Sequence, residues 1–506
     1  MVGDELIRLT DADFELFDQF VPQTHFLRQA ADAIAWSDMN DLLKGYYSSK
    51  KGRPSEPPLL FLKLEYLRYQ YRLSDSEVMD RAATDMSFRF FLQLGRKRQL
   101  PHTTCLCKFR GRLGADGFRK VFDQVIGMAR GQGLVRDRLR IKDATHIIAD
   151  IAIPSTLALV AGMRDRLLIA AEPFARDEVR GERINIELLR ESTDGMPDQE
   201  RLLHRVTHLR DIVTWVDRLV APDDAPTNRV WQKLVELSEL AHKILRDQEN
   251  PKSKDKTLSV VDPDARRSKH GDWYEGFMLD VIIDPDSDLI TQINVLAANG
   301  EEALDAIDLI KQEEAAHGND IESLSIDGAG FHGPMLSVLE DPDGLAISTF
   351  VPPKNEPESE LFGPGDFTEN EDGTVTCPAG QTSKRSEQVE NATKHHFAGP
   401  TCAACAMVSQ CMKIPPENHH GRKVRKNHYA DEYDRVRARA KTEEYACIRS
   451  DHYKVERKLG EIMNRHGGRR ARYRGKEHAH HHGDDGKTPG EATKEGRGHS
   501  ENSPRH

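Results

Sequence analysis

The spacing of hydrophobic residues divides the chain into helical and strand-like regions. Up to about residue 130, apolar residues recur at helical spacing, most clearly in PPLLFLKLEYLRYQYRL and SDSEVMDRAATDMSFRFFLQLG. Ser74 and Glu77 have the spacing of a capping box. At 138 to 153, RLRIKDATHIIADIAI changes to an Ile-rich strand pattern that is interrupted at Asp143. We therefore predict a helical domain over residues 1–130, followed by a sheet.

The remaining pattern predicts a mixed α/β fold with two interruptions. Leu-spaced, charged sequence at 155–260 indicates a helical insertion. GFMLDVIIDPDSDLITQINVLAANG then predicts a hairpin, EALDAIDLIKQEEAAHG a helix and SLSID a strand. We assign 131–476 to this α/β domain, 350–420 to an irregular cysteine-rich insertion, and 477–506, which contains His480 to His482, to a disordered tail.

Composition favours a globular protein. The 506 residues are 38% hydrophobic, which is enough for two or three domains with buried cores. No apolar run approaches the ~18 residues that cross a bilayer, and MVGDELIRLTDADFELF does not have the pattern of a secretion signal. We expect a cytoplasmic protein that does not enter the membrane.

The net charge of −11 hides two basic segments. Residues 89–142 contain fourteen Lys and Arg against three acids, and residues 422–476 contain eighteen against eight. Such clustering indicates contact with nucleic acid, although solvated helix faces would give the same pattern.

Two aspartates end or interrupt apolar strands and are followed by small residues. They are Asp143, before Ala144, and Asp327, before GAG. Each alone would suit a turn. Together with a third carboxylate they could hold two Mg²⁺ ions about 4 Å apart, the arrangement that cleaves phosphodiesters. Glu456 is the candidate third acid. It begins a predicted helix whose apolar stripe is Val455, Leu459 and Ile462.

These motifs resemble a bacterial insertion-sequence transposase of the DDE type. The resemblance rests on IKDATHIIADIAIPS, DPDARRSKHGDWYEGFMLDVIID, SLSIDGAGFHG and VERKLGEI, preceded by VPQTHFLRQAADAI, YYSSKKGRPSEPP and TTCLCKFRGRL. It covers roughly residues 18–476. It implies an RNase H-like catalytic core, and a homodimer acting on double-stranded DNA at the element ends and target.

The resemblance implies that Asp143, Asp327 and Glu456 bind the catalytic Mg²⁺ or Mn²⁺. The family usually has glycine at the position of Ala144 and a basic residue about two helical turns after the glutamate, where this chain has Met463 and then Arg465. Asp280 and Asp284 are rivals for the second acid. The candidate contacts to DNA phosphates are Arg465, Arg469, Arg470, Arg472 and Arg474.

Four of the seven cysteines have spacing that suits tetrahedral zinc. Cys377, Cys402, Cys405 and Cys411 follow the pattern C-x24-C-x2-C-x5-C. The alternative is unpaired thiols in a loop. A structural Zn²⁺ is therefore one expectation, beside the catalytic Mg²⁺.

The sequence predicts metal-dependent cleavage and strand transfer at the ends of an insertion sequence. Two alternatives stay open. One is a zinc-stabilised DNA-binding protein, derived from a transposase, without catalysis. The other is a metal-dependent nuclease that cuts DNA but does not join it.

Overall fold

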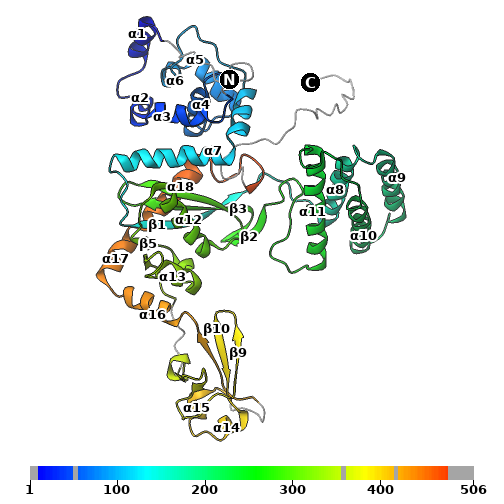
Figure 1. Ribbon diagram of the computed structural model, residues 1–506, viewed down its shortest axis with the longest axis vertical. Helices are drawn as coiled ribbons and strands as arrows, with labels where there is room; N and C mark the ends of the chain where they lie inside the picture. The colour runs from blue at the N-terminus through cyan, green and yellow to red at the C-terminus, as the bar shows by residue number, and fades with distance from the viewer. Residues whose placement is uncertain (1–8, 49–54, 355–359, 415–419, 477–506) are drawn as a thin grey trace, which may run out of the picture. The chain divides into compact units, whose positions relative to one another are not determined.

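The computed structural model describes residues 9–48, 55–354, 360–414 and 420–476, which divide into two compact units (Figure 1). One unit combines the residues up to Val121 with the segment that starts at Ala471, and the other runs from Phe122 to Arg470. The predicted tail at 477–506 lies outside the described residues. Within the described part of the chain, no helix has both the length and the apolar character that crossing a bilayer requires.

The amino-terminal unit is helical, as predicted. Its elements are α1 (Asp11–Phe20), α2 (Phe26–Ala33), α3 (Trp36–Lys44), α4 (Pro58–Gln70), α5 (Asp75–Thr84), α6 (Met86–Phe91) and the first part of α7 (Thr104–Gly131). Helix α5 begins at the predicted capping box, in which Glu77 N donates to Ser74 Oγ at 3.2 Å and Ser74 N donates to Glu77 Oε2 at 2.7 Å. Helix α7 breaks its helical backbone at Gly114, where a φ of 57° favours glycine.

The carboxyl-terminal segment is anchored in this unit through Tyr473. Arg68 Nη1 donates to its hydroxyl at 3.0 Å. The buried Glu65 carboxylate pairs with Arg68 at 2.9 Å and with Arg110 at 2.7 Å, and Arg110 also pairs with Asp75 at 2.6 Å. Because losing one partner would leave a buried charge unpaired, this network holds the returning segment firmly against α4.

A six-stranded sheet forms the centre of the second unit (Figure 1). Its strands are β1 (Arg140–Ile148), β2 (Arg266–His270), β3 (Asp272–Asp284), β4 (Leu289–Ala297), β5 (Ser323–Ser325) and β6 (Ser348–Phe350). Strand β3 is antiparallel to β1, β2 and β4, whereas β5 is parallel to β1 and β6 is parallel to β5. The strand order is β2–β3–β1–β5–β6, and β4 also pairs with β3. The combination of a helical amino-terminal region with a mixed α/β domain is confirmed.

Different helices pack on the two faces of this sheet. Helices α12 (Glu302–His317) and α13 (Gly333–Leu339) pack on Ile282, Leu324 and Ile326. Successive strand residues point to opposite faces, so Ser325 belongs to the other face. There it lies 3.5 Å from His452, just before α18 (Tyr453–Arg465), which packs on β1 and β3.

The predicted helical insertion has its own core. Helices α8 (Thr156–Ala171), α9 (Arg176–Ser192), α10 (Asp198–Val216) and α11 (Arg229–Glu249) follow β1 in the chain, and α8 contacts each of the other three. Leu167, Leu209 and Ala241 are fully buried among them. The sequence between β1 and β2 thus packs upon itself.

Residues 360–414 and 420–427 form a small segment that we call the cysteine-rich module. It contains β7 (Thr368–Glu369), β8 (Val375–Thr376), β9 (Arg385–Val389), β10 (Ala392–His396), α14 (Gly399–Ala403), α15 (Val408–Cys411) and β11 (Lys423–Asn427). We predicted irregular sequence here, but the structure has short antiparallel strands, which are too brief to produce a clear hydrophobic alternation. Helices α16 (Ala430–Arg439) and α17 (Glu443–Ser450) then lead to α18.

Candidate active site

Asp143 and Asp327 lie at corresponding positions on two neighbouring strand paths. Parallel pairing joins Ile141 of β1 to Ser325 of β5, and the two aspartates each come two residues later. Strand β1 continues beside β3, whereas β5 ends and its chain turns away. Residues in register on parallel strands share a face, so the two carboxylates emerge side by side where the β1–β5 ladder ends.

The surroundings of Asp143 disfavour its negative charge. Burial raises the pKa of its carboxyl to about 7. The N–H of Ala144 donates to Oδ1 at 2.9 Å and works against this shift, while the carboxylates of Glu302 and Asp327 add to it. The effect of Asp327 shows that the two candidate acids lie within electrostatic range. A bound cation would relieve this crowding of negative charge.

Asp327 also caps the turn that follows β5. Its Oδ1 accepts a hydrogen bond from Ala329 N at 2.9 Å. Asp327 therefore stabilises this turn, as aspartates in turns commonly do, and also lies near Asp143. Within the GAG sequence, a Cβ on Gly330 would come 2.9 Å from Ile326 Cβ, whereas one on Gly328 would meet nothing within 4 Å. Gly330 is therefore required by core packing, and only Gly328 adjoins open space.

Glu456 lies in the first turn of α18 and is exposed. The helix buries Val455, Leu459 and Met463 at four-residue spacing. Ile462, which we expected in this stripe, is only half-buried. Met463 is therefore a core residue, and this chain has no basic side chain at that position. The buried stripe anchors α18 while Glu456 remains accessible.

Arg449, in α17, interacts electrostatically with all three candidate acids. Burial lowers the pKa of its guanidinium, and the phenol of Tyr445 and the carboxylates of Asp327, Glu456 and Asp143 act in the opposite direction. One cation thus lies within electrostatic range of acids that come from β1, from the turn after β5 and from α18. The three acids, dispersed in the sequence, share one neighbourhood.

Arg449 is held in place by hydrogen bonds. Its Nη1 donates to Ile326 O at 2.8 Å and to Ser325 Oγ at 3.1 Å, and it lies 3.0 Å from Nδ1 of His452. Burial, and then Arg449, lower the pKa of His452 to about 4, so its neutral imidazole can accept at Nδ1. The sequence reasoning missed both residues. The sequence signal that could have found them is their closeness to Glu456: Arg449 comes seven residues before it and His452 four residues before it.

The rival acids Asp280 and Asp284 lie on the opposite face. Asp280 is 2.8 Å from Lys142 Nζ, and Asp284 is 3.5 Å from Arg140. Burial raises the pKa of Asp280 well above its ordinary value, and Lys142 opposes that shift. Both acids share the face of Ile282, which packs in the α12 cluster. They are structural partners of buried cations.

Among the five candidate phosphate-binding arginines, Arg469 and Arg472 donate hydrogen bonds to backbone carbonyls. Arg469 Nη1 donates to His146 O at 2.8 Å. Arg472 Nη1 donates to Leu73 O at 3.3 Å, and its guanidinium lies 5.1 Å from the centre of the Tyr69 ring. These two side chains hold the segment after α18 in place.

The other three arginines, Arg465, Arg470 and Arg474, are exposed. Arg465 has a long contact of 3.7 Å to Glu461. Exposed guanidinium groups of this kind can meet phosphate from solvent.

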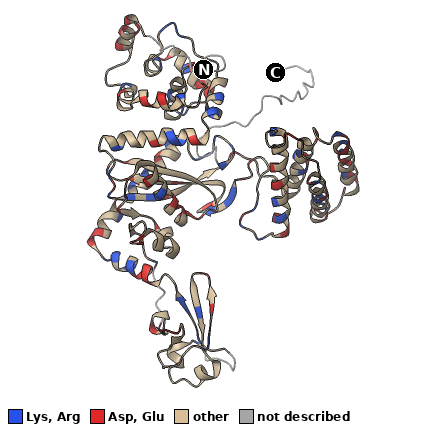
Figure 2. Cartoon of the chain, in the orientation of Figure 1, with Lys and Arg blue, Asp and Glu red and all other residues tan. Residues whose placement is uncertain are grey.

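The two basic segments differ in how much charge they expose. In the first, four of the fourteen cations are buried: Arg89, Arg110, Arg140 and Lys142. In the second, no Lys or Arg among the described residues is buried. In Figure 2, basic residues recur along α16, within that second segment, together with acidic ones. Residues 422–476 are therefore the better candidate for contact with DNA.

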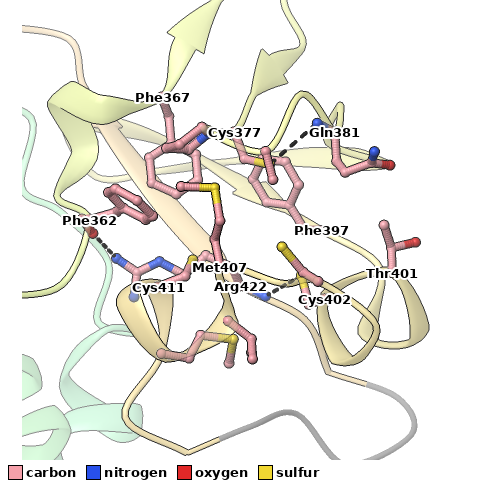
Figure 3. A pocket seen from close by; sticks show the side chains of 15 residues that line it. Phe362, Phe367, Cys377, Gln381, Phe397, Thr401, Cys402, Met407, Cys411 and Arg422 are labelled. Carbon is pink, nitrogen blue, oxygen red and sulfur yellow. Dashed lines mark hydrogen bonds between the residues drawn. The ribbon is translucent and has the colours of Figure 1, made fainter.

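The four clustered cysteines line one small cavity in the cysteine-rich module (Figure 3). Its volume is about 30 Å³. Burial raises the pKa of the Cys411 thiol, and Cys402, Cys377 and Cys405 raise it further. Cys105, Cys107 and Cys447 lie in helices α7 and α17, away from this cluster in the chain.

The oxygen donors at the sheet edge fit Mg²⁺ or Mn²⁺ by their chemistry. Carboxylates are the ligands that these hard cations prefer. Among the residues that the structure describes, no three His, Cys, Asp or Glu side chains already converge around one point closely enough to enclose an ion. Asp143, Asp327 and Glu456 are thus neighbours that would have to close further around a metal.

Two known families match separate parts of the chain. Residues 15–112 match a family described as a transposase domain (DUF772), and residues 376–483 match a family described as a transposase DDE domain. The first match covers α1 to α6, and the second contains Glu456 and the clustered cysteines. Neither a curated protein nor a solved structure matches the chain.

Proposed function

We propose that the chain is an insertion-sequence transposase of the DDE type, which cleaves and joins DNA strands at the ends of its element in a metal-dependent reaction; matches to a transposase domain and a transposase DDE domain support this. Asp143, Asp327 and Glu456 are the proposed metal-binding carboxylates. The observation that carries this assignment is the parallel register of β1 and β5, which brings Asp143 and Asp327 side by side.

The sheet supports an RNase H-like core, which the DDE family implies. In its order β2–β3–β1–β5–β6, with β4 also paired to β3, strand β3 is antiparallel to β1, β2 and β4, and β5 and β6 continue the sheet parallel to β1. The first proposed acid is on the central strand β1, the second follows its parallel neighbour, and the third is on a helix that packs on β1. Rigid elements therefore position all three.

A bound Mg²⁺ or Mn²⁺ would activate a water or a DNA 3′-hydroxyl as the nucleophile and would stabilise the oxygen that leaves the phosphodiester. The chain's own task is to present the oxygen ligands. Asp143 is fixed by the ladder to β3, Asp327 by its hydrogen bond to Ala329, and Glu456 by the buried stripe of α18. A divalent cation would also offset the repulsion that burdens Asp143.

Arg449 is the proposed positioning residue for this site. Its hydrogen bonds to Ile326 O and Ser325 Oγ fix the chain immediately before Asp327. Its charge interacts with the same three carboxylates that would bind metal. Arg449 therefore limits the mutual repulsion of the three carboxylates and fixes the path of the chain between β5 and Asp327.

The substrate in this proposal is double-stranded DNA, bound largely through its phosphates. The exposed Arg465, Arg470 and Arg474 are the proposed contacts, so affinity should fall steeply as salt rises. Holding two element ends requires two sites, and we propose a homodimer on DNA. The mass of the complex with a single element end and with paired ends would test this stoichiometry.

The test of the catalytic proposal is Asp327→Asn, assayed on a labelled duplex that carries the element's own end. The amide keeps the shape of the side chain and removes the charged ligand. Cleavage and joining should fall by several orders of magnitude in Mg²⁺ and in Mn²⁺, while folding and DNA binding persist. Asp143→Asn and Glu456→Gln should behave alike, and pairs should add little, since the three act as one unit.

Asp284→Asn is the matched control, because Asp284 belongs to the opposite face and accepts from Ser287 N at 2.9 Å. It should still cleave. A dead Asp284→Asn beside an active Asp327→Asn would show that the second acid was misassigned. A parent protein that binds element ends and never cuts would favour the non-catalytic DNA-binding alternative, and one that cuts without joining would favour the nuclease.

A further inference from the structure

We infer that the cysteine-rich module is a structural zinc site in which Cys377, Cys402, Cys405 and Cys411 provide the four ligands. This inference concerns the folding of residues 360–427. It is independent of the catalytic proposal, because a protein that never cleaves DNA could hold this zinc.

The module brings the four sulfurs together from three stretches of chain. Cys377 follows β8, Cys402 lies in α14 with Cys405 just after it, and Cys411 ends α15. All four line the same cavity of about 30 Å³, which has room for a single water-sized or ion-sized occupant. The lining contains no His, Asp or Glu side chain. An all-sulfur donor set favours zinc over the hard cations that suit the sheet edge.

Backbone N–H groups already point at two of the sulfurs. Gln381 N lies 3.4 Å from Cys377 Sγ, and Arg422 N lies 3.5 Å from Cys402 Sγ, as the dashed lines in Figure 3 show. Such donors stabilise a thiolate much more than a neutral thiol, because the acceptor is then charged. These two backbone donors are placed where they could donate to the sulfurs as zinc-bound thiolates.

Arg422 also supplies a compensating charge. Zinc with four thiolates carries a net charge of −2, which is costly in an apolar cavity. The Arg422 side chain lines that cavity, and its Nη2 is held by Phe362 O at 2.8 Å. The cation is thus fixed beside the proposed complex, and the same residue donates its backbone N–H to Cys402.

The module has little else to hold it together. Its buried hydrophobic cluster consists of four residues, Phe367, Val375, Phe397 and Val424, with Cys377, Cys402 and Cys411 packed against it. A segment with so small a core ordinarily needs a metal or disulfides to remain folded. All four thiols are free in the structure.

Ligation requires a modest closure of the site. No three metal-ligating side chains within the described ranges already stand in metal-holding geometry, so the sulfurs must turn further inward. Each cysteine can do this by rotation about its single side-chain bond. The short x2 spacing of Cys402 and Cys405 lets one turn supply two adjacent ligands.

The experiment is metal analysis of the full-length protein, purified under reducing conditions without chelators. It should contain close to one zinc per chain and no stoichiometric iron. Cys402→Ser with Cys405→Ser should lose that zinc and become sensitive to protease cleavage within residues 360–427. The matched control is Cys105→Ser with Cys447→Ser, which removes two thiols outside the module and should retain both zinc and protease resistance.

Two further measurements keep the inference falsifiable if the double variant does not fold. Cobalt exchanged into the parent protein should give the absorption of a tetrahedral all-thiolate site. Replacement of His480, His481 and His482 by Ala should leave the zinc content unchanged, which excludes adventitious binding to the tail. Parent protein that is folded without zinc, that contains two disulfides in the module, or that keeps its zinc after loss of Cys402 and Cys405 would overturn the inference.

Discussion

The two faces of the central sheet differ in whether a cation contacts their carboxylates. On the α12 face, Asp280 lies 2.8 Å from Lys142, and Glu313 lies 2.7 Å from Arg140. On the α18 face, Asp143 is crowded by other carboxylates, and burial raises its pKa to about 7. Adjacent residues of one strand, Lys142 and Asp143, thus belong to two different electrostatic environments.

This difference separates structural acids from functional ones. A buried carboxylate with a cation at contact distance has its charge balanced and needs no ligand. A group of carboxylates that share a single arginine has unfavourable repulsion, which persists only where the rest of the fold enforces it and commonly marks a site of function. The metal-binding candidates are therefore distinguished by the lack of a cation at contact distance, more than by their position at a strand end.

The largest effect is expected from removing the ion pair between Lys142 and Asp280 on the α12 face. Lys142→Met should leave Asp280 without its close cation and weaken the second unit by about 3–5 kcal/mol. Hydrogen exchange at the amides of β1 and β3 would measure this locally, since a protein with two units does not unfold in one step. Adding Asp280→Leu to Lys142→Met should restore most of the loss. Equal protection in the parent and in Lys142→Met would show that the pair contributes nothing.

The next effect concerns Arg449, whose charge interacts with the carboxylates of the α18 face. Arg449→Lys keeps a charge but loses the fixed hydrogen bonds to Ile326 and Ser325, so cleavage should fall about 10- to 100-fold and require more Mg²⁺. A Mg²⁺ titration of cleavage checks this, because a purely structural role would leave the midpoint in place. Arg457→Lys is the control, since Arg457 is exposed and pairs with Asp288 at 2.6 Å. Identical Mg²⁺ midpoints in Arg449→Lys and parent would refute the positioning role.

On the α18 face, burial of Asp143 should also make the stability of the protein depend on pH. The folded pKa of Asp143, about 7, lies above its unfolded value of about 3.9, so the folded state binds more protons between those values. Stability should fall as pH rises through this window. Without added Mg²⁺ or Mn²⁺, Asp143→Asn should match the parent near pH 4 and be more stable at pH 8, by up to about 4 kcal/mol. Hydrogen exchange at the amides of β1 across that pH range would show it, and a constant difference would contradict the assignment.

The smallest effect concerns the arginines after α18, some of which are exposed whereas others donate hydrogen bonds to the protein backbone. Arg470→Gln with Arg474→Gln removes exposed charges, so the slope of log affinity against log salt should become shallower by about 0.9 for each DNA phosphate that is no longer neutralised. Arg469→Gln with Arg472→Gln removes hydrogen bonds to His146 and Leu73 and should mainly lower thermal stability. DNA-binding titrations at several salt concentrations distinguish the pairs. If both pairs change the slope equally, these hydrogen bonds do not separate structural from DNA-binding arginines.

Strong periodicity made much of the fold predictable. The helices around α4, the strand at Asp143, the hairpin of β3 and β4, and helix α12 follow from spacing alone. The strands of the cysteine-rich module did not, because β7 and β8 have two residues each. In α18 the stripe was placed on Ile462 by hydrophobicity, whereas the helix buries Met463, at regular four-residue spacing from Val455 and Leu459.

The candidate site was predictable only in part. Strand ends pointed to Asp143 and Asp327, but Asp280 and Asp284 remained rivals, because the register that puts them on the other face and their pairing with Lys142 and Arg140 cannot be read from the sequence. Arg449 was missed for a similar reason. Its side chain reaches Ser325 because the chain breaks between α17 and α18, a feature that leaves no signal in hydrophobic spacing. The sequence alone therefore gives a set of candidate metal-binding acids, and the ion pairs in the folded structure distinguish the structural acids from the remaining candidates.

The insertion of α8 to α11 after β1, and of the cysteine-rich module after β6, has a consequence for biosynthesis. Asp143 leaves the ribosome well before Glu456, and at common translation rates the interval is roughly tens of seconds. During that time a nascent chain cannot present the complete set of carboxylates. Because these contacts join remote parts of the sequence, their assembly is also intrinsically slow. A message truncated before codon 456 therefore specifies a chain that lacks the third acid and also the Tyr473 anchor of the helical unit.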